Sequence, residues 1–304
     1  MYNGIINVRK EAGFTSHDVV AKLRGIFGQR KIGHTGTLDP AATGVLPVCL
    51  GQGTKLVDMI TDRNKVYEAR VLLGITTDTE DTTGNETGRY ELPSGFCDGG
   101  KEETENTIKK VLESFVGGYE QIPPMYSAIK KDGKRLYELA REGREIERSA
   151  RPVQIHSIEL LDVELPYFTM RVHCGKGTYI RSLCRDIGEK IGCGACMDTL
   201  CRTRVGRFVL DEALTLEELQ KLKDEDRLSE VVIPVDVMFE EYKQVDAPEE
   251  YAKLIKNGNK VNSSVCEGLY SPVRMYCDGV FCGIYELDDK KKEYYPVKMF
   301  ACGE

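Results

Sequence analysis

One carboxylate stands alone in a long stretch of small and apolar residues. Asp39 is the only charged side chain in the 22 residues of segment 33–54, which read GHTGTLDPAATGVLPVCLGQGT. The glycines around it let a ligand approach the backbone closely, and Pro40 biases Asp39 toward an extended conformation. A single carboxylate in such a segment is suited to nucleophilic attack. Because an Asp-Pro pair is also a common turn starter, the residues alone leave both interpretations open.

Other chemistries fit the candidate segments less well. Segment 33–54 lacks the Gly-Lys-Ser/Thr ending of a P-loop and the spacing of a dinucleotide-binding turn. Glycoside hydrolases pair two carboxylates, so that alternative needs a partner for Asp39 elsewhere in the chain. Cys193 and Cys196 form one C-x-x-C pair, with Cys201 and His173 as conceivable additional metal ligands. Zinc ribbons need two such pairs, and we therefore expect reduced thiols and no metal.

The charge distribution indicates where a polyanion could bind. The chain of 304 residues carries a net charge of −7. Residues 211–304 sum to −9, which leaves +2 on residues 1–210. Within that part, residues 171–210 hold a local +5 and residues 121–151 a local +3. These two segments are candidates for phosphate contacts, although a charge run can also be a solvated helix face.

Composition sets the class of protein. With 30% charged and 41% hydrophobic residues, the sequence is that of an ordinary globular protein. It contains no apolar run long enough to span a membrane, and its N-terminus lacks the pattern of a secretory signal. Its eleven cysteines are scattered and odd in number, which favours reduced thiols and a cytoplasmic protein.

Periodicity predicts an α+β fold. A capping box at Thr15 and Asp18 starts a helix that reaches Phe27, and Thr215 with Glu218 caps another. The order of elements contains no βαβ repeat, which favours a mixed or antiparallel sheet followed by a small, mainly β module. The other expected elements are strands at 4–9, 66–73, 153–164, 167–174 and 203–210, a polar loop or hairpin over 78–106, and helices from about Thr104 and Thr178.

Five motifs in order resemble one family. They are GHTGTLDPAATGVLPVCLGQGTK (33–55), KVYEARVLLGITTDTEDTTG (65–84), QIPPMYSAIKKDGKRLYELAREG (121–143), GKGTYIRSLCRDIGEKIGCGA (175–195) and LCRTRVGRF (200–208). Together they resemble the TruB family of tRNA pseudouridine synthases. The resemblance implies a pseudouridine-synthase fold over residues 1–232, with a central mixed, mainly antiparallel sheet and an RNA-gripping thumb loop at about 121–148. It implies a PUA-like RNA-binding module over residues 233–304.

The resemblance also implies roles for single residues. Asp39 matches the family's nucleophile, which isomerises uridine to pseudouridine without cofactor or metal. Because a base inside an RNA loop cannot be reached in place, it is flipped into the pocket, where it needs a stacking partner. The substrate-binding positions that match the family are His34, which helps hold the flipped-out nucleotide, the stacking residue Tyr67, the active-site arginine Arg181, and the pocket residues Tyr179 and Leu200.

The resemblance finally implies a partner. The expected substrate is the T arm of tRNA, modified at position 55, with no protein partner, no membrane and a monomeric enzyme. Two alternatives remain: a guide-RNA-dependent relative, which the intact thumb segment disfavours, and an RNA-binding or tRNA-folding protein with incidental catalysis. The basic residues expected to contact RNA from the thumb are Lys130, Lys131, Lys134, Arg135, Arg141 and Arg144.

Overall fold

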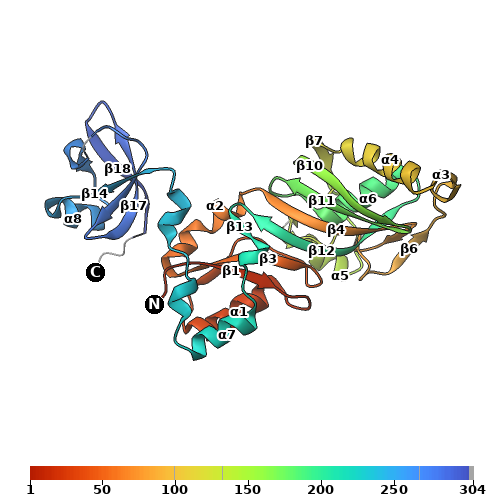
Figure 1. Cartoon of the computed structure of the whole chain (residues 1–304), viewed down its shortest axis with the longest axis horizontal. Helices are drawn as coiled ribbons and strands as arrows, with labels where there is room; N and C mark the ends of the chain where they lie inside the picture. The colour runs from red at the N-terminus through yellow and green to blue at the C-terminus, as the bar shows by residue number, and fades with distance from the viewer. Residues whose placement is uncertain (99, 132, 267, 301–304) are drawn as a thin grey trace.

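The protein is built around two β-sheets of unequal size, as Figure 1 shows. The computed structural model describes residues 1–98, 100–131, 133–266 and 268–300. The larger sheet has nine strands and lies in the elongated main body, whereas the smaller sheet has five and forms a separate terminal module (Figure 1). Among the helices of the described ranges, none combines the length and apolarity needed to cross a bilayer.

The larger sheet is mixed and mainly antiparallel, as the sequence predicts. Its strands follow the order β1-β3-β12-β4-β11-β10-β7, with β2 paired to β3 and β13 to β12. The β12–β3 pair is parallel, and the other described pairs of this sheet are antiparallel. The strands are β1 (Gly4–Lys10), β2 (Ile32–His34), β3 (Thr43–Leu50), β4 (Lys65–Leu73), β7 (Gly117–Gln121), β10 (Arg151–Glu164), β11 (Tyr167–Cys174), β12 (Ala195–Val205) and β13 (Phe208–Val209).

Four amphipathic helices cover this sheet. Helices α1 (Ser16–Phe27) and α7 (Leu216–Asp224) bury their apolar sides against the β1–β3 end. Helices α4 (Gly100–Glu113) and α6 (Ile180–Ile191) pack over β4, β10, β11 and β12. The two capping boxes that the sequence predicts for α1 and α7 are both present. The sequence therefore predicts a helix at each of these four places correctly.

Three expectations about local structure were wrong. Segment 203–210 is not one strand, because Gly206 adopts φ 54° and turns the chain from β12 back into β13. Helix α4 begins at Gly100 and not near Thr104, since acidic residues in its first turn suit the positive end of the helix dipole. Segment 33–54 is not one continuous loop, because β2, β3 and η1 occupy all of it except residues 35–42, which carry Asp39.

The remaining elements of the main body are short. A hairpin of β5 (Ile75–Thr77) and β6 (Glu86–Arg89) occupies the expected loop, and α3 (Ser94–Asp98) precedes α4. The thumb segment between β7 and β10 contains a hairpin of β8 (Lys130–Lys131) and β9 (Lys134–Arg135), followed by helix α5 (Leu136–Arg141). The main body also contains α2 (Val57–Thr61) and the 3₁₀ helices η1 (Gly51–Leu56), η2 (Leu210–Glu212), η3 (Leu228–Val231) and η4 (Val235–Phe239).

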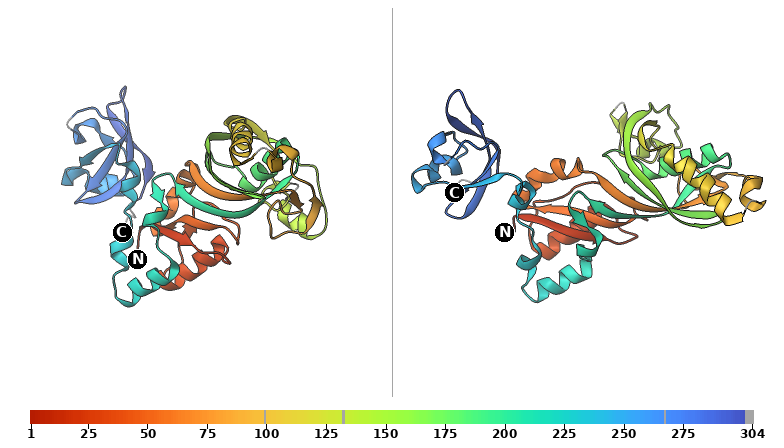
Figure 2. Two further views of the ribbon diagram at one scale, coloured as in Figure 1. Left: turned by 45° about the vertical axis from the view of Figure 1, so that its right-hand side comes forward. Right: turned by 45° about the horizontal axis from the view of Figure 1, so that its top comes forward.

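The terminal module is a small sheet joined to the main body by apolar contacts. Figure 2 shows it at one end of the molecule in both views. Segment 233–239 belongs to the main body, because Ile233 bridges to Ile5 and Phe239 packs in the same cluster as Val45. Phe300 of the module joins that cluster. The elements of the module are β14 (Lys243–Asp246), α8 (Glu249–Lys256), β15 (Val261–Asn262), η5 (Ser263–Val265), β16 (Val273–Cys277), β17 (Val280–Asp288) and β18 (Glu293–Met299).

Gly44 provides a test of how tightly β3 and β12 approach one another. It adopts φ +109°, and a Cβ at this position would lie 2.2 Å from the Arg202 carbonyl oxygen. We expect Gly44→Ala to lower the free energy of unfolding in urea by at least about 2 kcal/mol, through backbone strain and a backbone clash. The control is Gly25→Ala in α1, where a Cβ meets nothing within 4 Å and should stabilise by roughly 0.5–1 kcal/mol. Equal effects of the two substitutions would contradict this account.

Candidate active site

Asp39 lies in the loop between β2 and β3, and buried groups fix that loop from beneath. Lys10 on β1 donates through Nζ to the carbonyl of Pro40 at 3.1 Å. The N–H of Leu38 donates to Ser16 Oγ on α1 at 3.0 Å, and the Leu38 side chain is buried in the core. The carboxylate of Asp39 is therefore carried by a short loop whose backbone is held on both sides of it.

The lysine beneath the loop is fully buried. Burial lowers the pKa of Lys10 from 10.5 to about 8, although the nearby charge of Asp39 opposes the shift. Lys65 at the start of β4 is also buried, and burial together with the charge of Arg202 lowers its pKa to about 8. Lys10 thus places a buried positive group directly beneath the loop of Asp39, a setting that suits an anionic ligand.

A bidentate ion pair joins Asp39 to Arg181 at the start of α6. Arg181 Nε lies 2.9 Å from Asp39 Oδ2, and Nη2 donates to Oδ1 at 3.1 Å. The arginine side chain is 6% exposed, whereas that of Asp39 is 36% exposed. The parallel geometry fixes the plane of the carboxylate, and its exposure leaves the carboxylate open to a ligand.

The other donors of Arg181 reach two further segments. Nη1 donates to the Thr79 carbonyl at 3.0 Å, and Nη2 to the Tyr126 carbonyl at 2.9 Å. Asp81 Oδ2 lies 3.9 Å from Nε. One buried guanidinium therefore binds together the loop of Asp39, the turn after β5 and the beginning of the thumb segment.

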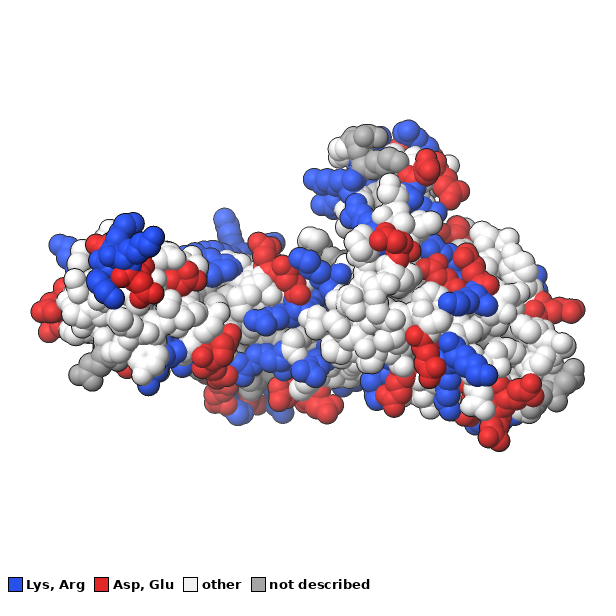
Figure 3. All heavy atoms as spheres, turned by 90° about the horizontal axis from the view of Figure 1, so that it is seen from above, with Lys and Arg blue, Asp and Glu red and all other residues white. Residues whose placement is uncertain are grey.

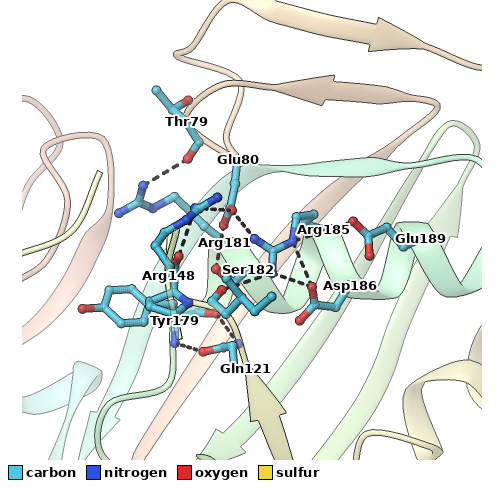
Figure 4. A network of polar contacts seen from close by, with 12 residues as sticks. Thr79, Glu80, Gln121, Arg148, Tyr179, Arg181, Ser182, Arg185, Asp186 and Glu189 are labelled. Carbon is cyan, nitrogen blue, oxygen red and sulfur yellow. Dashed lines mark hydrogen bonds and ion pairs between the residues drawn. The ribbon is translucent and has the colours of Figure 1, made fainter. Parts of the chain in front are cut away.

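The position of Arg181 depends on how α6 begins. Tyr179 is the N-cap residue of this helix. Its N–H donates to Gln121 Oε1 at 2.9 Å, and its carbonyl accepts from Gln121 Nε2 at 3.0 Å. Figure 4 shows this amide bridge beneath Tyr179, with Arg181 following on the helix. The end of β7 therefore sets where the first turn of α6 places its arginine.

A second network on α6 holds the thumb segment at both ends. Glu80 accepts from Ser182 Oγ at 2.6 Å and pairs with Arg185 Nη1 (Figure 4). Arg185 Nη2 also donates to the Ile122 carbonyl at 3.1 Å, where the thumb begins. Arg148, near the end of the thumb, lies 4.0 Å from Glu80 Oε1. The same helix therefore positions the Asp39 pair and anchors the thumb.

The sequence interpretation missed part of these networks. The pattern of residues 78–106 predicts a polar loop or hairpin, although Glu80 and Asp81 from that segment are buried beside the arginines of α6. The available signal was the sequence Asp-Thr-Glu-Asp at 78–81, which places three acids within four residues. Arg185 was likewise not singled out, because a helix pattern does not tell which charge faces a buried acid.

Tyr67, Leu200 and Arg202 line adjoining positions on two paired strands. Tyr67 on β4 lies opposite Arg202 on β12, and Ala69 lies opposite Leu200. Residues directly opposite in an antiparallel pair share one face of the sheet. Tyr67 is 7% and Leu200 8% exposed. Burial raises the pKa of Tyr67, Arg202 opposes that shift, and the charge of Asp39 adds to it, so that the phenol belongs to the surroundings of Asp39.

Tyr179 reaches the same surroundings from the start of α6. Burial raises the pKa of its phenol, while the neighbouring Ser127 opposes the shift. The charges of both Asp39 and Arg181 also act on it. The structure thus brings together Asp39, Tyr67, Tyr179 and Arg181, which are far apart in the sequence.

His34 lies at the other end of the loop, as the last residue of β2. Its ring meets that of His17 on α1 edge to face, with centroids 5.1 Å apart. Burial lowers the pKa of His34, and the charge of His17 lowers it further. His34 is therefore mostly a neutral imidazole at pH 7 that adjoins the loop of Asp39 without belonging to the arginine network.

The basic thumb residues lie on the short elements β8, β9 and α5 and at the surface, where Figure 3 shows blue Lys and Arg side chains interspersed with red Asp and Glu over the face in view. Lys130, Lys134, Arg135 and Arg141 are all exposed. Lys134 pairs with Glu142 at 3.2 Å, and Arg141 lies over the Tyr137 ring. The side chain of Lys131 lies outside the described part of the structure. Nearby acids thus neutralise part of the positive charge of the thumb.

The cysteines form no ligand cluster within the described residues. Cys193 and Cys196 are both buried, and burial raises the pKa of Cys196 to about 11. No group of three or more His, Cys, Asp or Glu in the described ranges is arranged to hold a metal ion. The buried C-x-x-C thiols therefore pack as apolar side chains.

Comparisons with known proteins agree with the five motifs. Residues 24–180 match the N-terminal domain model of TruB family pseudouridylate synthases, and residues 181–240 match the tRNA pseudouridylate synthase B C-terminal domain. A protein named tRNA pseudouridine synthase B from Lachnoclostridium phytofermentans is 50% identical over 98% of this chain and 99% of its own length. A protein of the same name from Alkaliphilus oremlandii is 42% identical over 97% of both chains.

Solved structures share the fold of the whole chain. A chain of a crystallised Cbf5-Nop10-Gar1 complex superimposes with a TM-score of 0.71 and 26% identity, covering 98% of this chain and 85% of that one. A chain of the archaeal box H/ACA Nop10-Cbf5 complex gives a TM-score of 0.68 over 99% of this chain and 86% of that one, at 23% identity. The main sheet and the terminal module therefore recur together in a known fold.

The arginine of the ion pair should contribute strongly to stability. Arg181→Met removes the donors that join three segments and leaves two carbonyls unpaired, so we expect the free energy of unfolding in urea to fall by about 2–4 kcal/mol. The control is Lys134→Met on the exposed thumb, which should change it by less than about 0.5 kcal/mol. Unchanged stability of Arg181→Met would mean that the guanidinium does not hold these segments together.

Proposed function

The chain belongs to the TruB family of pseudouridylate synthases, and we propose that it isomerises a uridine of tRNA to pseudouridine with Asp39 as the nucleophile. The observation that carries this proposal is the bidentate pair between Asp39 and a buried arginine. That pair presents one oriented and partly exposed carboxylate at the centre of the site. The relatives named tRNA pseudouridine synthase B support tRNA as the substrate.

The reaction exchanges one bond of the base for another. The bond between N1 of uracil and C1′ of the ribose breaks, the base turns, and a bond forms between C5 and C1′. The proton on C5 leaves and N1 gains one, so that the product is an isomer and no redox partner is needed. Asp39 provides the nucleophilic carboxylate, and Arg181 keeps its two oxygens in place before the substrate arrives.

The surrounding side chains would confine the base while it turns. The target uridine has to leave the RNA loop before it reaches Asp39, and we assign Tyr67 to stacking on its face. Leu200 and Tyr179 would line the same pocket, and His34 would hold the displaced nucleotide at the edge of the loop. The buried positions of Tyr67 and Leu200 support a dry pocket in which a base can be enclosed.

We assign the T arm, at position 55, as the site of modification, because the five motifs occur in the order of this family. The thumb would grip the RNA through its exposed basic residues. The anchoring of both thumb ends on α6 supports a coupling between RNA grip and the Asp39 pocket. Within the expected residues 233–304, we assign the five-stranded module that starts at Lys243 to further RNA binding.

The remaining assignments concern assembly and location. We propose a monomer that acts without a protein partner, since the thumb is present within the chain itself. The solved relatives in complexes carry other proteins, which keeps a guide-RNA-dependent mode as the second candidate. A cytoplasmic location fits thiols that form no disulfide among the described cysteines.

Tritium release from tRNA labelled at C5 of uridine tests the role of Asp39. The parent protein should release the label, and Asp39→Asn should release none while it still binds tRNA, because the amide keeps the shape of the loop but is not a nucleophile. Asp224→Asn on the exposed face of α7 is the matched control and should behave as the parent. Release by Asp39→Asn would remove the assignment, and binding without release by the parent would favour an RNA-folding protein.

Neutralising the thumb tests its phosphate contacts. We expect the triple change of Lys130, Lys131 and Arg135 to Gln to weaken tRNA binding and to reduce the slope of log affinity against log salt by up to about 3. In the matched control, Lys101, Lys109 and Lys110 on α4 are changed to Gln, which alters the net charge by the same amount as the thumb variant. If both triple variants change the slope by the same amount, the effect is one of net charge and not of the thumb.

A further inference from the structure

Arg202 is a buried cation for which the mechanism above has no role. It lies on β12 and is 1% exposed, among the largest fully buried side chains of the described residues. Its Nε donates to the Val45 carbonyl at 2.7 Å. No ion pair within the described ranges includes it, and its Nη2 is a buried donor without a hydrogen-bond partner there. An apolar side chain of similar length would fill this space without the cost of an unpaired buried charge.

The guanidinium lies between two parts of the candidate active site. On one side is the loop of Asp39, since a Cβ added to Gly36 would lie 3.6 Å from Arg202 Nη1. On the other is Tyr67, directly opposite on β4 and on the same face of the sheet. Burial raises the pKa of the Tyr67 phenol, and the charge of the neighbouring Arg202 guanidinium opposes that shift. Arg202 thus faces the residue assigned to stacking and borders the loop of the nucleophile.

The charge of Arg202 also affects two neighbouring lysines. It lowers the pKa of Lys10 and of Lys65, although burial is the larger cause for both lysines. The buried guanidinium therefore lowers the stability of the folded protein in two ways, because it disfavours the charge of two lysines and leaves one of its own donors unpaired. Packing alone does not explain why an arginine occupies this position. The open donor remains available for an oxygen that shifts or arrives when a substrate occupies the pocket.

We propose that Arg202 is a positioning residue of the active site, which holds the Tyr67 hydroxyl and so fixes the ring against the face of the target base. The Val45 carbonyl anchors the guanidinium from β3, and Tyr67 is thereby tied to the strand that follows the nucleophile's loop. The inference rests on the proposed function, because it assigns Tyr67 to the substrate. It concerns the rate after binding, since Arg202 is closed off from solvent.

A double-variant cycle tests whether Arg202 acts through the Tyr67 hydroxyl. Single-turnover tritium release and tRNA affinity are measured for the parent, Arg202→Met, Tyr67→Phe and the double variant. We expect Arg202→Met to slow release between about tenfold and a hundredfold and to change affinity by less than about twofold. In the Tyr67→Phe background the same change should slow release by less than about threefold. Arg202→Lys, which keeps the charge, should recover part of the rate.

The outcomes separate this inference from the proposed function. A parent that releases no label refutes the function itself, whereas an active parent with an equally active Arg202→Met refutes only the inference. Equal slowing by Arg202→Met in both backgrounds, or a loss of affinity as large as the loss of rate, also overturns it. Urea unfolding of the same four proteins gives a second cycle that needs no activity. Shifts of the midpoint should not be additive, and additive shifts would exclude the contact with the hydroxyl.

Discussion

The site depends on one buried guanidinium that has to find partners for all its donors. Arg181 is almost inaccessible to water, so each of its N–H groups left unpaired would cost more than an ordinary hydrogen bond. Asp39, the Thr79 carbonyl and the Tyr126 carbonyl meet this requirement together. Because these groups come from three segments far apart in the chain, the loop of the nucleophile, the turn after β5 and the start of the thumb have to fold around α6 at the same time.

The candidate active site contains buried positive charges, although the chain as a whole is negatively charged. The protein is acidic overall, with its negative charge concentrated after residue 210, yet the charged groups beside the loop of Asp39 include the buried cations Lys10 and Arg202, and Lys65 is a further buried cation near Arg202. Burial disfavours the charge of both lysines and lowers their pKa values to about 8. Backbone carbonyls stabilise the buried cations by accepting hydrogen bonds from them, as the Pro40 carbonyl does for Lys10 and the Val45 carbonyl for Arg202. The net charge of the chain is therefore a poor indicator of the charge of its ligand, and the local electrostatic field around Asp39 is a better one.

Helix α6 links recognition to chemistry within one rigid element. Its first turn carries Arg181 and Ser182, and its next turn carries Arg185; Ser182 and Arg185 hold Glu80, and Arg185 also holds the base of the thumb. A displacement of the thumb base would therefore act on α6 within one helical turn of the Asp39–Arg181 ion pair. The terminal module is joined differently, through the apolar cluster of Phe239 and Phe300 with the main sheet, so that its orientation rests on packing and not on charge.

The sequence by itself determined the local features of this protein. Periodicity predicted helices where α1 and α6 lie, the Thr-Asp and Thr-Glu capping boxes marked the starts of α1 and α7, and the motifs identified the family and Asp39. These features depend on residues within one or two turns of each other, where spacing alone carries the information. The turn at Gly206 and the start of α4 were missed, because one glycine conformation and the acids of a first turn outweighed the apolar pattern. Only the tertiary structure decided that Glu80 and Asp81 belong to the site, that Arg202 faces Tyr67, and that one arginine joins three segments. The physical reason is that a buried charge is satisfied by whichever carbonyls and carboxylates the folded chain brings within about 3 Å, and no sequence spacing encodes that choice.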